Sequence, residues 1–554
     1  MSKRMCLVLV LIVGILILIG AACAATGYFM YFQNGGMEEH GPQGKASSAT
    51  RPERPAAQGG GTLRLSGNLP PTLDPAVVQD STSAEYIVHL FSGLVTLNDD
   101  LEPAPDLAER WEIGDDGRTY TFYLVTDAAF SDGRPITAED VVYSLERALR
   151  PETGSPVAGD YLGDIVGAAD LAAGRTDRLE GVRIIDEYTL EIRIDEPKAY
   201  FLSKLTYPTA FVVDREQIEA EGERWMQRPN ASGPFVLETL SRERVVLARN
   251  EYYHGEAPAL DRVEYIISGG IPMTMYENDL LDIVNVPAFE VDRVADPHNP
   301  LYAEHRINPE LSVQYLAFDV ETPPFDDVAV RQAIAHAIDK ERIANLVLRG
   351  TALPAAGILP PGMPGHDPDL QGLEYDPERA RELLAGSRYG EPGAMPEIVL
   401  TISGTSGYMD GVTRAVVAML EENLGIDVMV EQVEWSHFLR DLTARRYAMF
   451  SSGWIADYPD AQNFLDLLFH SKSTQNRTGY ANERVDELLE RARVEADDDR
   501  RLALYRQAEE IIVNDAPWVP LSHGVTHTLV KPYVRGFTSS AGLYPWLKDV
   551  YLEP

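Results

Sequence analysis

Residues 426–451 decide the class of the fold. They read IDVMV at 426–430, WSHFLRDLTAR at 435–445 and YAMFS at 447–451. The first and last runs are short and predict strands, and the longer middle run predicts a helix. A helix between two short strands is the repeating unit of α/β folds, so we expect a largely buried sheet here.

The same alternation of helix and strand extends over the second half of the chain. Helix-end signals predict helices at 326–350, 376–386 and 410–425. These segments begin with an acidic residue, carry Pro in the first turn or stop at Gly, which is what the chemistry of helix ends selects. Two more helices are expected within 482–514 and a strand at 518–521, so this half predicts an α/β lobe.

The first half of the folded part also contains strands and helices. Residues 62–65, 119–124 and 189–194 alternate or are rich in aromatic and β-branched residues, which predicts strands. Thr137 is placed to cap a helix, and Asp140 stands at the third position of its first turn. Folded structure is expected from residue 62 onward.

The charge balance excludes one class of function. The 554 residues include 48 Lys and Arg against 86 Asp and Glu, which gives a formal net charge of −38. A nucleic-acid binder needs clustered basic residues to neutralise phosphates, and an anionic membrane surface would repel this protein. The length suggests three or four packing units.

The two cysteines, Cys6 and Cys23, both lie near the N-terminus. The body of the protein therefore has no disulfide, no cysteine nucleophile and no cysteine metal site. Residues 33–61 are rich in Gly, Pro, Ser, Ala and charged residues, which predicts a flexible tether.

The N-terminal segment 1–32 has a basic start followed by an apolar run at 6–32. One interpretation is a signal peptide that is cleaved before a lipidated Cys23, since residues 19–23 resemble a bacterial lipoprotein cleavage box. The other is a retained membrane anchor of about 26 residues, which exceeds the roughly 20 that a bilayer needs. Aromatic residues at 28–32 suit a membrane interface and favour the retained anchor. Both interpretations place the body on the outer face of a bacterial cytoplasmic membrane, in the periplasm or outside the cell.

Six sequence strings, spread over the whole body, resemble those of one known family. They lie, in order, at 90–111, 130–141, 232–237, 249–253, 323–333 and 453–460. By these strings the chain resembles the extracytoplasmic solute-binding proteins of ABC importers, of the oligopeptide- and dipeptide-binding type (family 5). The resemblance implies a two-lobe α/β fold of the periplasmic-binding-protein kind (class II, large type), with an extra α/β domain inserted in the first lobe.

The resemblance also implies boundaries and partners. Lobe I would comprise 62–91, 207–308 and 525–554, the extra domain 92–206, and lobe II 309–524. Because the chain crosses between the lobes more than once, a hinge that closes on ligand is expected. The implied partners are a peptide and the permease subunits of an ABC transporter. The protein would act as a monomer, without cofactor or metal.

A ligand site follows from the same resemblance. The residues implied for it are Asp457, Trp454, Gly453, Ile455 and Tyr458, together with Gln79, Asp80 and Ser81 from the facing lobe. Asp457 would bind the peptide ammonium, Gly453 and Ile455 would offer backbone groups, and Trp454 would wall a pocket. Fixing only the backbone and the ammonium leaves room for variable side chains.

Simpler roles exist for the same residues. In the alternative interpretation Asp457 only caps a turn, since Asp is a common turn former, and Trp454 belongs to the core. Asp460 is expected to cap the helix that starts near Ala461. Some peptide binders carry an Arg just upstream of the Gly-Trp pair, where this chain has Ser451 and Ser452, so the group that receives the ligand carboxylate is unassigned.

Other ligands and another class of function stay open. Relatives of this type also hold nickel chelates, haem or oligosaccharides. An extracellular hydrolase would need a nucleophile or a metal, but residues 404–407 lack the last Gly of a nucleophile elbow, and the chain contains no His-Glu-x-x-His string. His523 and His527 have a metal-binding spacing only on a helix, which Pro520 and Gly524 disfavour, so structural histidines are expected.

Overall fold

The computed structural model describes residues 60–538 and 544–553. The predicted anchor at 1–32, the lipid attachment at Cys23 and all but the end of the tether at 33–61 lie outside the described residues. Every helix of the described part is too short or too polar to span a bilayer.

The first sheet belongs to lobe I and has four strands. Their order is β1 (Thr62–Ser66), β10 (Arg262–Ile266), β9 (Arg244–Arg249) and β8 (Phe235–Leu240). Strand β1 is parallel to β10, and the other neighbours are antiparallel. Helix α2 (Ser81–Leu90) packs on this sheet, where Tyr86 contacts Tyr265 with ring centroids 4.7 Å apart. This packing fixes the N-terminus of α2, which borders the site described below.

The second sheet is antiparallel and lies inside the segment predicted as the extra domain. Its order is β4 (Ala108–Ile113), β5 (Thr119–Leu124), β7 (Thr189–Arg193) and β6 (Val182–Asp186). Helix α3 (Ala138–Leu149) begins with a capping box formed by Thr137 and Asp140, as the sequence predicts. The short helices near it are α4 (Ala158–Leu162), α5 (Ala168–Ala172) and α6 (Phe201–Lys204). The exact domain boundaries stay a prediction.

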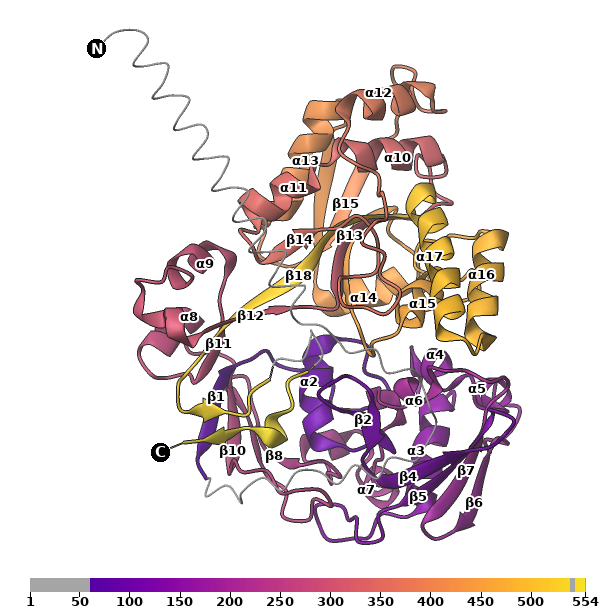
Figure 1. Cartoon of the computed structure of the whole chain (residues 1–554), viewed down its shortest axis with the longest axis vertical. Helices are drawn as coiled ribbons and strands as arrows, with labels where there is room; N and C mark the ends of the chain where they lie inside the picture. Colours follow the sequence, from indigo (N-terminus) through magenta and orange to yellow (C-terminus); the bar gives the residue numbers. More distant parts are fainter. Residues whose placement is uncertain (1–59, 539–543, 554) are drawn as a thin grey trace. The chain divides into compact units, whose positions relative to one another are not determined.

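The third sheet has eight strands, of which β13, β15, β16 and β17 form the centre of lobe II, while β11 and β12 extend it toward lobe I (Figure 1). Its main path is β11 (Ile283–Asn285), β18 (Trp518–Val530), β13 (Ser312–Phe318), β17 (Met449–Ile455), β15 (Ile398–Ser403) and β16 (Val428–Val433), and β12 (His305–Pro309) and β14 (Ala352–Pro354) pair with β18. Along β13, Val313, Tyr315 and Ala317 enter one hydrophobic cluster and Leu316 and Phe318 another. The sheet is thus buried on both faces, as the α/β interpretation predicts.

Helices cover the two faces of this sheet. They are α10 (Val328–Ala337), α11 (Lys340–Arg342), α12 (Pro377–Gly386), α13 (Gly411–Leu424), α14 (Trp435–Thr443), α15 (Leu465–Phe469), α16 (Glu483–Val494) and α17 (Asp498–Asp515). The other described elements are β2 (Val95–Leu97), β3 (Pro103–Pro105), η1 (Pro208–Ala210), α7 (Arg215–Glu221), η2 (Gly222–Gln227), α8 (Pro272–Glu277), α9 (Ala288–Val294), η3 (Pro300–Glu304), η4 (Ile343–Val347), η5 (Ala461–Asn463), β19 (Val534–Arg535), η6 (Leu547–Asp549) and β20 (Tyr551–Leu552).

The long strand β18 joins the two lobes. Its first part pairs with β13 of lobe II, and its last part pairs with β11 and β12. In Figure 1 it runs from the region of β13 and β14 toward β11. The connection from β12 into β13 crosses beside it in the opposite direction. Two neighbouring crossing segments are the arrangement that a hinge requires.

The helix predicted at 326–350 is wrong as a single helix. Helix α10 ends at Ala337, and Asp339 then caps a new start, because its side chain accepts a hydrogen bond from the Arg342 backbone N–H. A short polar side chain that bonds local backbone groups competes with helix continuation, and this one interrupts the helix. The strand predicted at 518–521 continues to Val530, because pairing across the hinge extends it.

Gly233 stands where lobe I leaves no space for a side chain. An added Cβ would lie 2.7 Å from the backbone carbon of Leu90 and from the nitrogen of Phe91. The backbone at this point is also held, since Gly233 N–H donates to the Leu90 carbonyl at 2.9 Å.

We predict that Gly233→Ala lowers the free energy of unfolding by about 1–3 kcal/mol, the usual cost of overpacking. Gly386→Ala is the matched control, because an added Cβ meets nothing within 4 Å at the end of α12. This control should be neutral or stabilising by up to about 1 kcal/mol. Denaturant unfolding of both variants measures the difference, and equal stabilities would contradict the steric argument.

Candidate functional site

A cavity of about 130 Å³ lies where lobe I, the extra domain and lobe II meet. Its lining comes from residues 79–81, helix α4, strand β17 and the loop between α15 and α16, with further side chains from β13, α14 and β18. Segments from across the described chain are therefore needed to build it, which is typical of a ligand site between lobes.

The structure brings seven of the eight predicted site residues into this lining. These are Gln79, Asp80, Ser81, Gly453, Trp454, Ile455 and Asp457. Tyr458 does not line the cavity: its side chain is fully buried among the lobe I core residues, and its hydroxyl donates to the Gln462 side chain. The structure therefore makes Tyr458 a packing residue.

The end of β17 presents a free edge toward this site. Residues 449–455 of β17 all pair with β13, whereas β15 pairs only with Met449 and Phe450 on the other side. Within the described residues, Gly453 and Ile455 thus lie beyond the β15 pairing. Unpaired backbone groups at a strand edge are able to bind an extended chain.

Gly453 also makes space for its neighbour on β13. An added Cβ would lie 2.3 Å from the side-chain nitrogen of Gln314, which faces it across the ladder. A glycine here lets the strand pass that side chain without a clash.

The Asp457 carboxylate has hydrogen bonds but no cation. It accepts hydrogen bonds from the Tyr161 hydroxyl and from the Asn463 side-chain amide, the latter at 3.0 Å. No Lys, Arg or His of the described part forms an ion pair with it. Burial raises the pKa of Asp457 to about 6, against an ordinary value of 3.8, although the two hydrogen bonds lower it. Both bonds come from side chains, so Asp457 does not cap the turn through a backbone N–H.

Asn463 holds the two main residues of the site in place. Its side-chain oxygen accepts hydrogen bonds from the indole Nε1 of Trp454 at 3.1 Å and from the Asp457 backbone N–H at 3.0 Å. Neither Asn463 nor Tyr161 was predicted from the sequence. Each is remote in sequence or part of another element, so no motif spacing points to it.

Asp460, three residues after Asp457, has a structural role. Its side chain accepts from the Gln462 backbone N–H at 2.9 Å and so caps η5, as predicted. It also accepts two hydrogen bonds from the Arg501 guanidinium, at 2.8 and 3.0 Å. The two aspartates therefore differ in pairing: Asp460 is paired with a cation, and Asp457 forms no ion pair within the described residues.

The facing lobe contributes polar groups from the start of α2. Asp80 caps this helix by accepting from the Ser83 backbone N–H at 2.9 Å. The side-chain oxygen of Gln79 is buried and has no hydrogen-bond partner among the described residues. A buried acceptor without a donor costs free energy, so Gln79 is available to accept from a ligand N–H.

Stacked aromatic rings form part of the walls. Tyr161 stacks on Tyr207 with ring centroids 3.8 Å apart, and Tyr315 stacks on Trp518 at 3.4 Å. Such rings offer broad apolar contact with little conformational freedom to lose, which suits a pocket that must accept different side chains.

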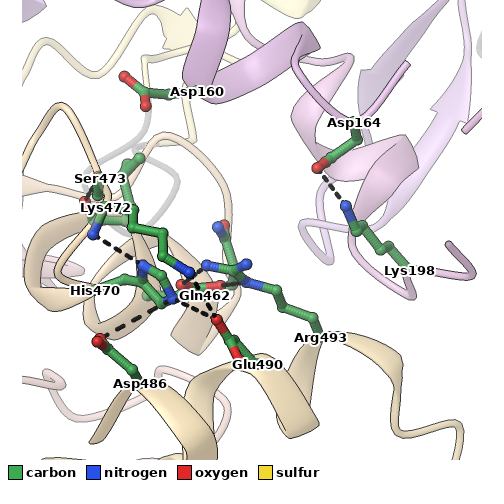
Figure 2. A network of polar contacts seen from close by, with 12 residues as sticks. Asp160, Asp164, Lys198, Gln462, His470, Lys472, Ser473, Asp486, Glu490 and Arg493 are labelled. Carbon is green, nitrogen blue, oxygen red and sulfur yellow. Dashed lines mark hydrogen bonds and ion pairs between the residues drawn. The ribbon is translucent and has the colours of Figure 1, made fainter. Parts of the chain in front are cut away.

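A second cavity, of about 390 Å³, lies between the extra domain and lobe II. Figure 2 shows its charged residues, with Asp164 and Lys198 on one side and His470, Glu490 and Arg493 on the other. Lys198 and Lys204 both pair with Asp164 of the extra domain. On the lobe II side, Arg493 pairs with Asp466, and His470 and Lys472 pair with Glu490. These ion pairs stay within one lobe.

The histidines of β18 form hydrogen bonds with neighbouring segments of the sheet. His523 is buried with Nδ1 3.0 Å from the Ser312 carbonyl oxygen, and His527 lies 2.9 Å from His305 and 3.0 Å from the Gly350 carbonyl oxygen. Across the described residues, no group of three or more His, Cys, Asp or Glu is arranged to hold a metal ion.

Comparison with known proteins gives consistent matches. Residues 102–476 match the bacterial extracellular solute-binding proteins of family 5, in their middle region. The chain is 33% identical over 497 residues to the probable deoxycholate-binding periplasmic protein YgiS of Escherichia coli, covering 87% of this chain and 92% of the relative. It is 31% identical over 490 residues to the periplasmic oligopeptide-binding protein OppA of E. coli, covering 86% and 89%.

The solved structures agree with this grouping. The murein tripeptide binding protein MppA of E. coli matches with a TM-score of 0.81 at 26% identity, over 90% of this chain and 99% of that one. An unliganded open form of MppA matches with a TM-score of 0.67 at 27% identity, over 90% and 98%.

The contrast between the two aspartates generates a prediction. We expect Asp457→Asn to raise the free energy of unfolding of the empty protein by about 1–3 kcal/mol at pH 7.5, because it removes a buried charge without a cation. Since burial raises the pKa of Asp457 to about 6, ionisation destabilises the folded state as the pH rises through 6. The advantage of the variant should therefore vanish toward pH 4.

Asp460→Asn is the matched control. It removes the carboxylate that accepts two hydrogen bonds from the buried Arg501 and leaves only the exposed Asp498, at 3.3 Å, so it should destabilise the protein by up to about 3–5 kcal/mol. Denaturant unfolding at pH 7.5 and pH 4.5 measures both variants. Loss of stability in Asp457→Asn at pH 7.5 would contradict the unpaired-charge interpretation.

Proposed function

Because the chain belongs to the bacterial extracellular solute-binding proteins of family 5, we propose that it captures short peptides outside the cytoplasmic membrane and delivers them to an ABC importer. The family match over residues 102–476 supports solute binding as the general role. The proposed activity is binding without turnover. The protein would act as a monomer, attached to the membrane through the segment before residue 60.

The observation that carries the proposal is the Asp457 carboxylate. It lines the cavity, has its hydrogen bonds from Tyr161 and Asn463, and has no cation among the described residues. A ligand ammonium would neutralise it and gain charge-assisted hydrogen bonds to a buried carboxylate. This favours a ligand that carries a free amine.

The remaining groups suit a peptide backbone. The free edge at Gly453 and Ile455 offers strand-like hydrogen bonds. The buried side-chain oxygen of Gln79 has no donor among the described residues and is able to accept from a ligand N–H. The aromatic walls formed by Tyr161 and Trp518 contact side chains without specific polar demands. A peptide matches each of these features, whereas deoxycholate, after which one relative is named, has no amine to offer Asp457.

Lobe closure is the second part of the proposal. The crossing segments at β12 and β18 provide a hinge, and the ion pairs near the second cavity stay within their own lobe. Separating the lobes thus leaves these charges paired, which keeps the cost of opening low. The higher TM-score to MppA than to its unliganded open form supports an open state in this family.

We predict that a panel of di- and tripeptides with free termini contains ligands that isothermal titration calorimetry detects at pH 7.5. Asp457→Asn should weaken the tightest of them by at least about 10-fold, since a charge-assisted hydrogen bond is lost. Native mass spectrometry of the purified protein identifies any ligand that co-purifies. Unchanged affinity in Asp457→Asn would refute the ammonium site, and turnover of the peptides would refute binding without catalysis.

The pH provides an independent test of the same site. Because the pKa of Asp457 in the empty protein is about 6, peptide affinity should fall as the pH drops below 6 and the carboxylate becomes neutral. The affinity of Asp457→Asn should not change over this interval. A parallel pH dependence in both proteins would assign the titration to another group.

Closure itself predicts a smaller radius of gyration in solution scattering when the tightest peptide is added. The Asp457→Asn variant at the same peptide concentration is the control and should change less, in proportion to its lower occupancy. A radius that stays constant in the saturated wild-type protein would contradict hinge closure.

A further inference from the structure

Arg477 lines the same cavity as Asp457. It lies in the loop between α15 and α16, and its Nη2 donates to the Gln475 side-chain oxygen at 2.7 Å. Within the described residues no Asp or Glu forms an ion pair with it. Burial lowers the pKa of Arg477 below its usual range, although Tyr315 and Asp160 act in the opposite direction.

Other arginines with comparable burial are treated differently. Arg147 donates to both carboxylate oxygens of Asp74, Arg493 to both of Asp466, and Arg501 to both of Asp460. In each of these three cases the protein supplies a carboxylate, and the buried Arg331 donates instead to the backbone carbonyl oxygens of Phe325 and Asp515. At Arg477 it supplies a neutral amide, and among the described residues the other N–H groups of the guanidinium, beside the cavity, have no hydrogen-bond acceptor.

We propose that Arg477 binds the carboxylate of the ligand, and that Asp457 and Arg477 together select a short dipolar ligand with an ammonium at one end and a carboxylate at the other. The inference rests on the proposed function and adds its second anchor. The two side chains carry opposite unpaired charges in one cavity and form no ion pair with each other. A planar guanidinium is suited to a carboxylate, which it binds with two parallel hydrogen bonds.

Gln475 and Asp160 position the guanidinium. The Gln475 side-chain oxygen accepts from Arg477, while its nitrogen donates to the Asp160 carboxylate at 3.0 Å. Thr474 donates to the same carboxylate at 2.6 Å. Asp160 belongs to helix α4 of the extra domain and lies apart from the cluster around His470 and Glu490 (Figure 2). The carboxylate anchor is therefore oriented by a contact that crosses from lobe II to the extra domain.

Both anchors depend on α4. Tyr161, which follows Asp160 in this helix, donates to the Asp457 carboxylate. Opening the lobes would remove Tyr161 from Asp457 and Asp160 from Gln475 together. The closed arrangement thus orients both ends of the ligand site at once, which links capture of a dipolar ligand to closure.

The test compares three forms of the tightest peptide in the panel: with free termini, with a C-terminal amide and with an acetylated N-terminus. In the wild-type protein the amide should bind about 10- to 100-fold more weakly than the free acid, as expected for the loss of a charge-assisted bidentate contact. Arg477→Gln should weaken the free acid by the same factor, leave the amide unchanged and keep the discrimination against the acetylated form. Gln475→Leu should give an intermediate acid-to-amide ratio.

Arg484→Gln is the matched control, because Arg484 is exposed and pairs with Glu487 on α16. It should leave the acid-to-amide ratio unchanged. Thermal unfolding checks that Arg477→Gln is folded, and if it is not, Arg477→Lys keeps the charge without the planar fork and should still reduce the ratio.

The outcomes separate this inference from the proposed function. If peptides bind and depend on Asp457, but Arg477→Gln keeps the wild-type acid-to-amide ratio, the carboxylate assignment is wrong and peptide capture stands. If peptides fail and deoxycholate binds to the wild-type protein but not to Arg477→Gln, the carboxylate site stands without the dipolar selection, and peptide capture falls. If the wild-type protein binds neither, both proposals are overturned.

Discussion

The arrangement of the central cavity depends on one constraint, the burial of the Asp457 carboxylate, which forms no ion pair with any cation of the described residues. Such a group is tolerated only where its surroundings fix it and partly satisfy it by hydrogen bonds. Asn463 does this from η5 and at the same time holds Trp454, while Tyr161 reaches it from the extra domain. The nearby Asp460 received a buried arginine instead. The protein therefore pairs one aspartate of this segment with a cation, and the unpaired Asp457 is the one to which we assign the ligand ammonium.

Helix α4, which carries Asp160 and Tyr161, connects the site to the proposed closure of the lobes. Asp160 and Tyr161 of α4 contact residues of lobe II, whereas the lysines and arginines around the second cavity pair on their own sides. Opening would thus break hydrogen bonds of the binding site and the packing of Tyr458 against Tyr161, and would leave the surrounding ion pairs intact. A ligand that engages both anchors stabilises the state in which these contacts exist, and this is the differential affinity that a closing movement needs.

Much of the fold could be predicted because helix ends are decided by local chemistry. The segment at 376–386 is capped by Asp376, and the helix at 410–425 ends at Gly425 with a positive φ of 67°. The predicted ends of helices and strands were wrong where pairing with a distant strand or a bond from a local side chain determines where the element ends. Strand β17 runs to Ile455 through Ser451, Ser452 and Gly453, because its pairing with β13 outweighs their low strand propensity.

Only some residues of the site could be predicted from the sequence, for a related reason. The Gly-Trp string placed Gly453, Trp454 and Asp457 because they are neighbours in the chain. Tyr161 and Arg477 come from distant segments and line the cavity, and Asn463 bonds Trp454 and Asp457 from the next element, so only the folded structure shows that they meet. The net charge of the protein also does not identify the ligand. A formal charge of −38 would hinder the approach of an anion such as deoxycholate, but salt screens it within about 10 Å, and a zwitterion carries no net charge for it to repel. Under our proposal the ligand is therefore selected inside the cavity, where Asp457 and Arg477, which form no ion pair within the described residues, act on it at short range.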